Sequence, residues 1–385
     1  MKNNNILQTV KKGWKKFMKK EDKNAYLWYS AATDITGKKL AEELGISHGS
    51  DKPKGKKLVI GWGAKTKNAV ELPGATVLNH PNSIRQNRNK FASMAIMKDS
   101  GVNIAEFVDV DHIKDIKQAG GKKGVVLPVI GRKKYHQGGK GFWTCPTMTH
   151  VKEAINSGAQ YFQNLIEIDS EYRFHVFGGK VIYAVKKVKR TVQEMEEAYI
   201  RHETERQTEL AKKNGNNLDV ATMEIFLKRQ AKKFAQDGAN MLVRSNRLGW
   251  KFAKVNKPAP ALVAEALKAI DALKLQFGAV DGCIDASGKA WIFEVNTGPG
   301  LEQSPFKSYT EAFAGRIKEI LTDKPAVKPV VAPKVAVAKP VDLKKAAITT
   351  KASLQEKMRL AGEMVNVASE EEAKALESVF KKVFG

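Results

Sequence analysis

The sequence predicts a mixed α+β and α/β fold with more than one domain. The chain has 385 residues, enough for two or three domains of roughly 100–200 residues with a sizeable core. Short apolar runs that end in glycines alternate with segments of helical periodicity, which is typical of strands and helices that follow one another. Hydrophobic residues make up 42% of the chain, and no window of about 18 apolar residues could span a bilayer.

The charge of the chain favours anionic partners. A formal net charge of +25 suits nucleic acid, nucleotides and acidic or phosphorylated substrates, although a solvated lysine-rich surface is the alternative interpretation. The two cysteines, Cys145 and Cys283, offer neither a disulfide framework nor a zinc motif. The first 20 residues lack the continuous apolar core of a signal peptide. We therefore expect a cytoplasmic protein.

Residues 1–24 predict a basic amphipathic helix. Seven lysines lie between Lys11 and Lys23, and apolar residues recur at helical spacing, namely Ile6, Val10, Trp14 and Phe17. Such a helix can touch nucleic acid or a membrane surface. We expect its apolar side to dock on its own domain instead.

Residues 25–85 predict a first small domain of short strands and helices. The segment Gly55–Gly63, GKKLVIGWG, is typical of a buried strand that ends in glycines, and Ala75–His80, ATVLNH, predicts a second strand. The next segment, Ser83–Ser100, has helical periodicity.

Residues 159–190 predict two strands of a hairpin that turns at Gly178-Gly179. Apolar and polar residues alternate in the first of them, and we expect its His175 to face solvent. Residues 191–238 are polar and helix-forming with a break at 215–217, and predict two inserted helices that form a lid or a substrate-side arm. Residues 258–285 then predict a helix and a strand.

The C-terminal part of the chain has a different composition. Residues 323–349 are rich in Pro, Ala, Val and Lys, which indicates an extended, semi-rigid linker without a core. Residues 350–385 return to a helical pattern and predict a small appended helical module.

Two neighbouring strands bring polar ligands together. The segment GAVDGCIDASGKAWIFEVN predicts a hairpin whose first strand carries Asp281 and whose second ends at Glu294 and Asn296. Alternation puts Glu294 and Asn296 on one face, where an antiparallel partner lets Asp281 face them. Two carboxylates and an amide oxygen suit Mg²⁺. A buried polar pair at a strand end is the alternative, but the Gly-Pro-Gly exit that follows favours an open metal site.

This hairpin resembles the metal-binding end of the ATP-grasp superfamily, which includes D-alanine–D-alanine ligases, glutathione synthetases and protein-modifying glutamate ligases. The resemblance runs from about Lys57 to Ile320. It implies an ATP-grasp fold at residues 86–322, in which two α+β subdomains clasp ATP. A small α/β pre-ATP-grasp domain precedes it at residues 25–85, and a flexible C-terminal extension follows. The long basic tail resembles that of phage-encoded members.

The resemblance implies roles for individual residues. Two Mg²⁺ ions, with Mn²⁺ as an alternative, would be held by Asp281, Glu294 and Asn296. ATP would be bound by Lys90, Arg132, Gly139, Gly141, Gln163, Asn164, Ile166, Glu171 and Lys186, with Lys187 as the alternative to Lys186. Arg173 and Arg244 would act catalytically near the transferred phosphate, and the loop that carries His136 would cover the phosphates.

Two of these positions depart from the family pattern. Arg132 stands where the family has a lysine, and arginine can bind phosphate oxygens bidentately. Asn164 stands where the family has an acidic residue that contacts adenine. Glu171 matches the carboxylate that binds the ribose hydroxyls.

The resemblance implies an ATP- and Mg²⁺-dependent carboxylate–amine ligase. A substrate carboxylate would attack the γ-phosphorus, and an amine would displace phosphate from the acyl-phosphate. The acid and the amine could belong to a small molecule, a peptide, a protein or a modified nucleic acid, and the family implies a homodimer. Two alternatives stay open, namely a ligase or binding protein that acts on nucleic acid, and a catalytically inactive nucleotide-binding scaffold.

Overall fold

A computed structural model describes residues 24–118, 120–121, 123–136, 141–214 and 220–322. The chain divides into two compact units, residues 1–322 and 323–385, and the fold below is that of the first. The predicted N-terminal helix, the linker and the C-terminal helical module lie outside the described residues. Across the described ranges, no helix has both the length and the apolar character needed to cross a membrane.

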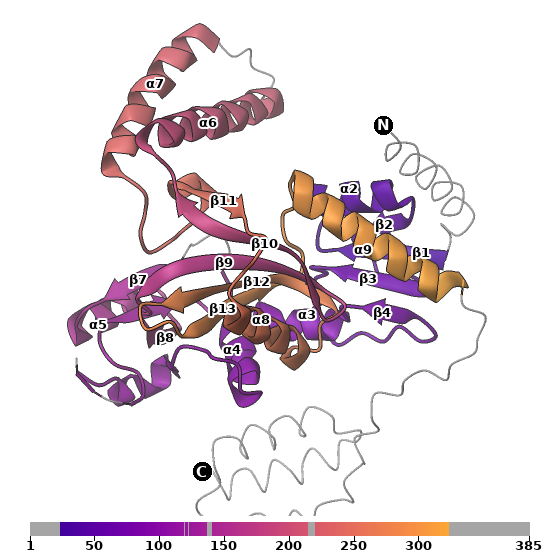
Figure 1. Ribbon diagram of the computed structural model, residues 1–385, viewed down its shortest axis with the longest axis horizontal. Coiled ribbons are helices and arrows are strands. Elements are labelled where there is room, and N and C mark those ends of the chain that lie inside the picture. Colours follow the sequence, from indigo (N-terminus) through magenta and orange to yellow (C-terminus); the bar gives the residue numbers. More distant parts are fainter. Residues whose placement is uncertain (1–23, 119, 122, 137–140, 215–219, 323–385) are drawn as a thin grey trace, which may run out of the picture. The chain divides into compact units, whose positions relative to one another are not determined.

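A four-stranded parallel sheet opens the described chain (Figure 1). Its order is β2-β1-β3-β4, with β1 at Ala25–Tyr29, β2 at Ser47–Gly49, β3 at Leu58–Trp62 and β4 at Thr76–Leu78. All five residues of β3 are buried, as a continuous apolar run in a parallel sheet requires. Helix α2, Ile35–Leu44, begins at Asp34, whose carboxylate accepts a hydrogen bond from the Gly37 amide at 2.8 Å.

A small antiparallel sheet follows. Its order is β5-β8-β6-β7, with β5 at Phe107–Asp109, β6 at Val129–Arg132, β7 at Phe142–Cys145 and β8 at Tyr161–Asn164. Helix α3, Pro81–Arg88, precedes this sheet in the chain, and the helical segments beside the sheet are α4, Lys90–Asp99, the 3-10 segment η2, Val110–Asp115, and α5, Met148–Asn156. The side chains of α5 pack with those of β6 and β7 in one buried cluster.

A five-stranded antiparallel sheet carries most of the polar residues that the sequence singles out. Its order is β11-β10-β9-β12-β13, with β9 at Ile168–Phe177, β10 at Lys180–Lys189, β11 at Trp250–Lys254, β12 at Phe277–Asp285 and β13 at Ala290–Asn296. The turn between β9 and β10 falls at Gly178 and Gly179, which have φ angles of +56° and +73°. The predicted hairpin is therefore confirmed.

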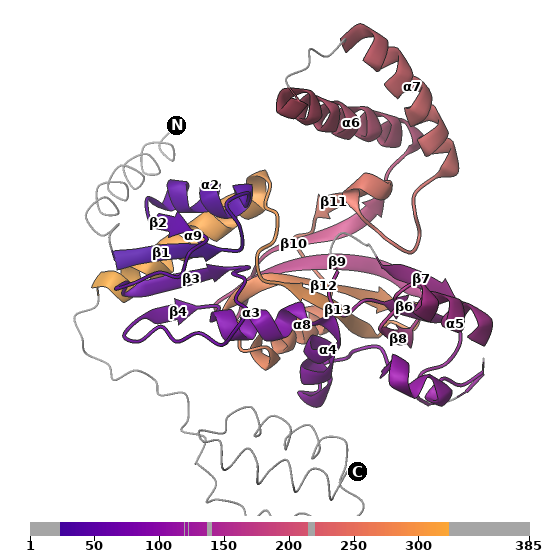
Figure 2. The same ribbon diagram turned by 180° about the vertical axis from the view of Figure 1, so that it is seen from behind.

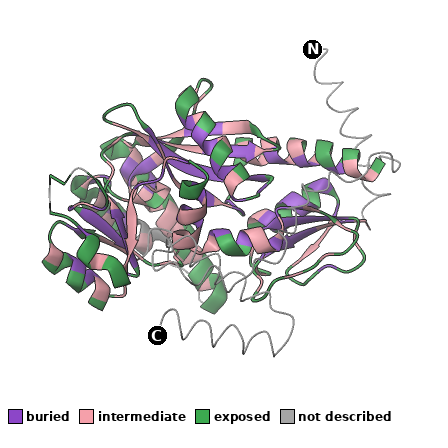
Figure 3. Ribbon diagram, turned by 90° about the horizontal axis from the view of Figure 1, so that it is seen from below, coloured by how far each residue is buried: buried purple, intermediate pink, exposed green. Residues whose placement is uncertain are grey.

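One face of this sheet is apolar and covered by helices. Phe174, Val176 and Val280 are fully buried there, in one cluster with Leu262 and Ala266 of α8, Pro260–Ala272. Because side chains alternate along a strand, the polar residues between these positions lie on the opposite face. Burial is concentrated in the strands, and the outward surfaces of the helices are exposed (Figure 3).

Two long helices interrupt the large sheet between β10 and β11. Helix α6, Val192–Asn214, and helix α7, Val220–Asp237, pack against each other and form the arm that Figures 1 and 2 show. The short 3-10 segment η3, Asn246–Leu248, leads back into β11. The prediction of two helices in residues 191–238 is confirmed.

Helix α9, Gln303–Thr322, joins the parallel sheet to the large sheet. Its Tyr309 and Phe313 pack edge-on against Trp62 of β3, whose ring also stacks on Phe277 of β12 at 5.7 Å between centroids. Aromatic pairs in these arrangements add to the burial of their large surfaces.

The prediction that His175 faces solvent is wrong. Its ring is 3% exposed, because Tyr309 of α9 lies against it with 5.5 Å between ring centroids. Burial, together with the nearby charge of Arg173, lowers the pKa of His175 to about 4.

Candidate active site

Asp281, Glu294 and Asn296 converge on the polar face of the large sheet. Asp281 of β12 pairs with Glu294 of β13 in the antiparallel ladder. The Asn296 side-chain amide donates to Asp281 Oδ2 at 3.2 Å and to Glu294 Oε1 at 3.1 Å. The structure thus brings together the three residues that alternation predicts to face one another.

Two cations pair with these carboxylates. Arg173 of β9 donates from Nε to Asp281 Oδ1 at 2.8 Å and from Nη2 to Oδ2 at 2.7 Å. Lys90 Nζ lies 2.9 Å from Glu294 Oε2. The ion pair with Asp281 raises the pKa of Arg173 against the effect of burial, so this guanidinium stays charged.

Glu294 is held ionised. Burial would by itself raise its pKa, but the charges of Lys90 and Arg132 and the hydrogen bonds from Lys90 and Asn296 outweigh burial and lower it. Arg132 ends β6 of the small sheet, and Lys90 begins α4. Cations from two further elements therefore stabilise a carboxylate of the large sheet.

The donor set fits a magnesium ion that also contacts phosphates. In the described ranges, no three His, Cys, Asp or Glu residues lie together as a metal site of their own. Two carboxylates and one carboxamide are too few for an all-protein cage, but Mg²⁺ normally keeps waters and shares phosphate oxygens. A carboxylate offers about four lone-pair positions, so Asp281 can accept from Arg173 and still bind a metal.

The start of α4 is tied to the strand that carries Arg132. Asn89 caps this helix by accepting from the Ala92 amide at 3.2 Å, and the Lys90 amide donates to the Lys134 carbonyl at 2.8 Å. These bonds fix Lys90 beside the end of β6.

Arg132 faces a histidine of the loop that follows it. Its Nη2 lies 2.9 Å from His136 Nε2, and its buried Nε has no hydrogen-bond partner. Burial and the charges of Arg132 and Lys90 lower the pKa of His136 to about 4, so its neutral ring can accept from the guanidinium. Gly141 lies beyond this loop with a φ of +67°, and Gly139 lies outside the described residues.

Glu171 belongs to a second buried ion-pair cluster on the same sheet. It accepts from Lys187 Nζ, and Arg244 Nε lies 3.8 Å from its Oε2. All three side chains are less than 10% exposed. Burial raises the pKa of Glu171, although the charges of Lys187 and Arg244 oppose this shift.

Lys187 lies on this face, whereas Lys186 lies on the other. The Lys186 ammonium is 5.6 Å from the centre of the Tyr172 ring, and these two residues pair across β9 and β10. A regular hairpin that starts at the pair Phe177–Lys180 would place Lys186 opposite Glu171. An irregularity between Val181 and Tyr183 shifts the register by one residue. The expectation of Lys186 on the phosphate side assumed a regular hairpin, and no feature of the sequence indicates the irregularity.

Arg244 is anchored by several groups. Its Nη2 donates to the Ile168 carbonyl at 3.1 Å, and its guanidinium lies 4.6 Å from the centre of the Trp250 ring. The structure therefore places Arg244 beside Glu171, while Arg173 lies beside Asp281.

The hinge residues lie at and after the end of β8. Asn164 Oδ1 accepts from the Val126 amide at 2.8 Å, and its Nδ2 donates to the Gly124 carbonyl at 3.0 Å. Its side chain thus ties down the neighbouring loop. Gln163 is 6% exposed within the small sheet, and Ile166 is half-buried in the segment that leads to β9.

A large open cavity of about 650 Å³ lies next to the loop that follows Asn296. It is lined by Lys39, Arg201, His202, Glu205, Asn246, Leu301, Glu302, Gln303 and Phe306. These residues come from α2, α6, η3 and the segment where α9 begins. Sequence reasoning missed them because they are distant in the chain and share no motif.

No protein-family model matches this sequence, and no curated protein matches it either. Solved structures of ATP-grasp ligases are similar to it. The match to D-alanine–D-alanine ligase from Bacillus anthracis has 12% identity, covers 77% of this chain and 95% of that one, and has a TM-score of 0.49.

Two peptide-bound structures are similar as well. The ATP-grasp ligase PsnB in complex with a minimal precursor, Mg and ADP has 11% identity over 78% of this chain and 97% of its own, with a TM-score of 0.46. The macrocyclase MdnC from Microcystis aeruginosa MRC, bound with precursor peptide MdnA, has 11% identity over 78% of this chain and 100% of its own, with a TM-score of 0.43.

The architecture of the described chain agrees with the resemblance seen in the sequence. A small antiparallel sheet carries Arg132, and a large antiparallel sheet carries Asp281, Glu294 and Asn296. A four-stranded parallel sheet precedes them both. The described residues thus show the α+β and α/β architecture that the sequence predicts.

Proposed function

We propose that the protein is an ATP- and Mg²⁺-dependent ligase that activates a carboxylate as an acyl-phosphate and joins it to an amine. One observation carries this proposal. Asp281 and Glu294 face each other with Asn296 between them, and Lys90 and Arg173 surround them with positive charge. Such a concentration of hard oxygen ligands and cations suits a triphosphate and its metal ions.

The residues of this chain divide the work of phosphoryl transfer. Lys90 and Arg132 would bind phosphate oxygens, and Gly139 and Gly141 would contribute backbone amides. Magnesium held by Asp281, Glu294 and Asn296 would neutralise charge on the triphosphate. The adenine would lie against Gln163, Asn164 and Ile166, and Lys187 takes the place proposed for Lys186 on the phosphate side. Glu171 would meet the ribose hydroxyls.

Arg173 and Arg244 would stabilise charge on the transferred phosphoryl group. In the first step, a substrate carboxylate oxygen bonds to the γ-phosphorus as the bond to the bridging β–γ oxygen breaks, which releases ADP. In the second, an amine attacks the acyl carbon, phosphate leaves, and the amine nitrogen loses a proton. The physical requirement is placement and charge neutralisation.

The acid and the amine would enter through the cavity of about 650 Å³. It borders the loop that follows Asn296. Lys39 and Arg201 of its lining suit a carboxylate, and Glu205 and Glu302 suit a protonated amine. Pooled amino acids, short peptides and organic acids are therefore the first substrates to test.

Trapping of the acyl-phosphate tests the proposal. The full-length protein is incubated with ATP, Mg²⁺, hydroxylamine and pooled carboxylates, and hydroxamate and ADP are measured. We expect hydroxamate with one class of acid, and a loss of at least about hundredfold in Glu294→Gln, the size expected when a charged group of the transition state is removed. Glu311→Gln, an exposed change on α9, is the matched control. ADP release without any hydroxamate would contradict a carboxylate ligase.

Nucleic acid is the second candidate acceptor, because the net charge is +25. Binding of an oligonucleotide would then weaken steeply with salt, since each neutralised phosphate releases counterions. Affinity that does not change between about 50 and 200 mM salt would exclude this acceptor.

A further inference from the structure

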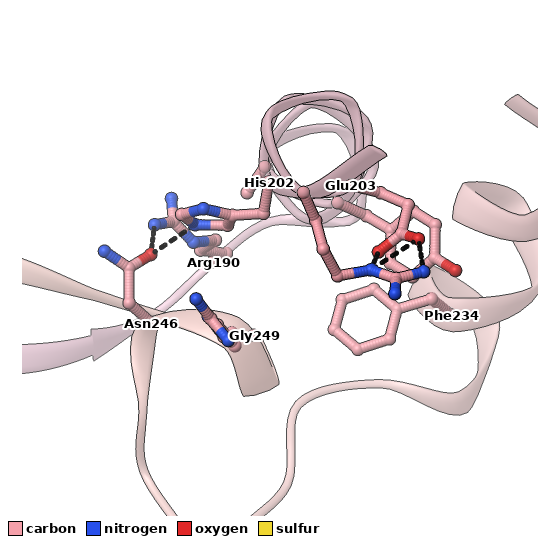
Figure 4. A pocket seen from close by; sticks show the side chains of 10 residues that line it. Arg190, His202, Glu203, Phe234, Asn246 and Gly249 are labelled. Atoms are coloured by element: carbon pink, nitrogen blue, oxygen red, sulfur yellow. Dashed lines mark hydrogen bonds and ion pairs between the residues drawn. The ribbon is translucent and has the colours of Figure 1, made fainter. Parts of the chain in front are cut away.

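A second, smaller cavity of about 120 Å³ lies in the arm (Figure 4). Its lining comes from the end of β10, from α6 and α7, and from the segment that leads into β11; the residues are Arg190, Ala198, Tyr199, His202, Glu203, Arg206, Phe234, Asn246, Arg247 and Gly249. A single water needs roughly 10–15 Å³ by this kind of measure, so the cavity has room for a small chemical group. The phosphate and metal site described above uses none of these residues.

The charges around this cavity are not balanced. The guanidinium of Arg206 is paired with Glu203, where Nε donates to both carboxylate oxygens at 2.9 Å. Arg190 donates to neutral acceptors, namely the Trp250 carbonyl at 3.1 Å and the side-chain oxygen of Asn246. Arg190 has no carboxylate partner in the part of the chain that the structure describes.

Arg247 adds a second positive charge, which lies close enough to Glu203 to lower the pKa of that carboxyl, although Glu203 itself is paired with Arg206. Arg247 is exposed, and among the described residues it makes neither a hydrogen bond nor an ion pair. Arg201 of α6, which lines the larger cavity, adds a third positive charge near Arg190. Burial, together with the charge of Arg201, lowers the pKa of Arg190. Like charges that lie close together repel one another, and a bound anion would relieve that repulsion.

The remaining walls supply polar groups and an apolar surface. Arg190 and Asn246 lie on one side of the cavity, and Phe234 lies on the other (Figure 4). The Phe234 ring packs against Tyr199 with 5.3 Å between ring centroids. A guanidinium opposite an aromatic wall is suited to a carboxylate or a phosphate with a short carbon skeleton behind it.

The two cavities share a boundary. His202 and Asn246 line both of them, and the His202 Nε2 lies 3.3 Å from Asn246 Oδ1. The larger cavity reaches the loop that follows Asn296. A substrate whose reacting end lies near this loop could therefore extend past His202 into the arm.

We propose that the arm cavity binds an oxyanion, carboxylate or phosphate, that the substrate carries at a distance from its reacting carboxyl or amine. The placement of the reacting end rests on the proposed ligase function, whereas the binding of the anion does not. The substrate would thus be a compound with a second anionic group, such as a dicarboxylate or a phosphorylated acid.

Arginine footprinting of the full-length protein tests this site directly. Phenylglyoxal modifies accessible arginines, and peptide mass spectrometry gives the rate at each position. At constant ionic strength, we expect glutarate or inorganic phosphate to slow the modification of Arg247 and Arg190. Arg229, an exposed arginine of α7 outside the cavity, is the internal control and should react at an unchanged rate. Comparison of glutarate with phosphate shows which anion the cavity prefers.

Two further measurements distinguish this proposal from the ligase proposal. ADP with Mg²⁺ should protect Arg132 and leave Arg247 reactive, so failure at Arg132 would count against the ligase and failure at Arg247 against the arm cavity. In Arg190→Gln, the anion concentration that half-protects Arg247 should rise about tenfold or more, as expected for a lost charge-assisted hydrogen bond. In Arg229→Gln it should not change.

Three results would overturn the arm cavity. The first is an equal decrease in the modification rates of Arg247 and Arg229, which indicates general screening of charge. The second is an unchanged modification rate of Arg247 with both glutarate and phosphate. The third is protection of Arg247 by an oligonucleotide alone, which indicates a nucleic-acid surface. The wild-type measurement needs no variant, so it decides the matter even where Arg190→Gln folds poorly.

Discussion

Removal of the Arg173 guanidinium should destabilise the protein by an amount that magnesium partly restores. Arg173 covers both oxygens of Asp281, whose side chain is 6% exposed. In Arg173→Met, the one remaining donor to Asp281 among the described residues is the Asn296 amide. A buried pair that loses one partner costs about 3–5 kcal/mol. Because Arg173 itself is 24% exposed, we expect the lower end, about 3 kcal/mol.

A double-mutant cycle isolates the pair. Asp281→Asn alone removes the negative charge and leaves Arg173 with a neutral partner, and the double variant removes both charges. We expect the double variant to be more stable than the sum of the single losses predicts, with an interaction energy of about 1–3 kcal/mol. Urea unfolding near neutral pH, followed by tryptophan fluorescence, measures each term as a shift in midpoint at constant slope.

Magnesium gives the same test a second readout. Arg173→Met leaves a buried carboxylate without its cation, so saturating Mg²⁺ should raise its urea midpoint more than that of the wild type. Asp281→Asn should show almost no such gain. A loss below about 1 kcal/mol in Arg173→Met, or an equal gain from Mg²⁺ in all variants, would refute the account of Asp281 as a buried metal ligand balanced by Arg173.

Three further predictions concern stability. Asn79, which is fully buried, donates from Nδ2 to the Phe277 carbonyl at 2.8 Å. Asn79→Ala should lower the free energy of unfolding, measured in urea, by about 2–3 kcal/mol. A loss under about 1 kcal/mol would show that water replaces the lost hydrogen bond. His175 has a pKa of about 4 in the fold, so below about pH 6.5 the unfolded chain binds a proton that the folded chain does not. The free energy of unfolding should therefore be constant above about pH 6.5 and fall by up to about 3 kcal/mol towards pH 4. His175→Gln should flatten this part of the curve, and an unchanged curve would exclude His175 as its cause. In Gly298→Ala, the new Cβ would lie 3.1 Å from the Cα and the nitrogen of Gly63, so the melting temperature should fall by several degrees. An unchanged melting temperature would mean that the loop that contains Gly298 can shift without cost.

The metal-ligand trio could be predicted because it depends on local geometry. Asp281, Glu294 and Asn296 belong to one hairpin, where alternation and a short turn fix which side chains meet. The strands Leu58–Trp62 and Thr76–Leu78 were predictable from their apolar runs, whereas the one helical segment predicted at Ser83–Ser100 is two helices, α3 and α4, which meet at Asn89.

Alternation along a single strand failed to predict two features of the structure. His175 is buried by Tyr309, which lies over a hundred residues later, and alternation within β9 cannot show that cover. Lys187, and not Lys186, shares the face of Glu171, because the pairing of β9 and β10 is irregular between Val181 and Tyr183. The burial of His175 is a tertiary effect, whereas the register shift is a local irregularity of the hairpin, and alternation along a single strand predicts neither.

The arm enters and leaves the fold at a single place. The last paired residues of β10 and β11 are Lys189 and Trp250, and the Arg190 amide donates to the Gly249 carbonyl at 3.0 Å. Its two ends are therefore already in hydrogen-bonding contact, so a short turn could join them without changing the strand ladder. Loops and insertions of this kind tolerate change in length and sequence. Under the role proposed for the arm, another arm grafted onto the same pair of strands would change the substrate that the protein accepts.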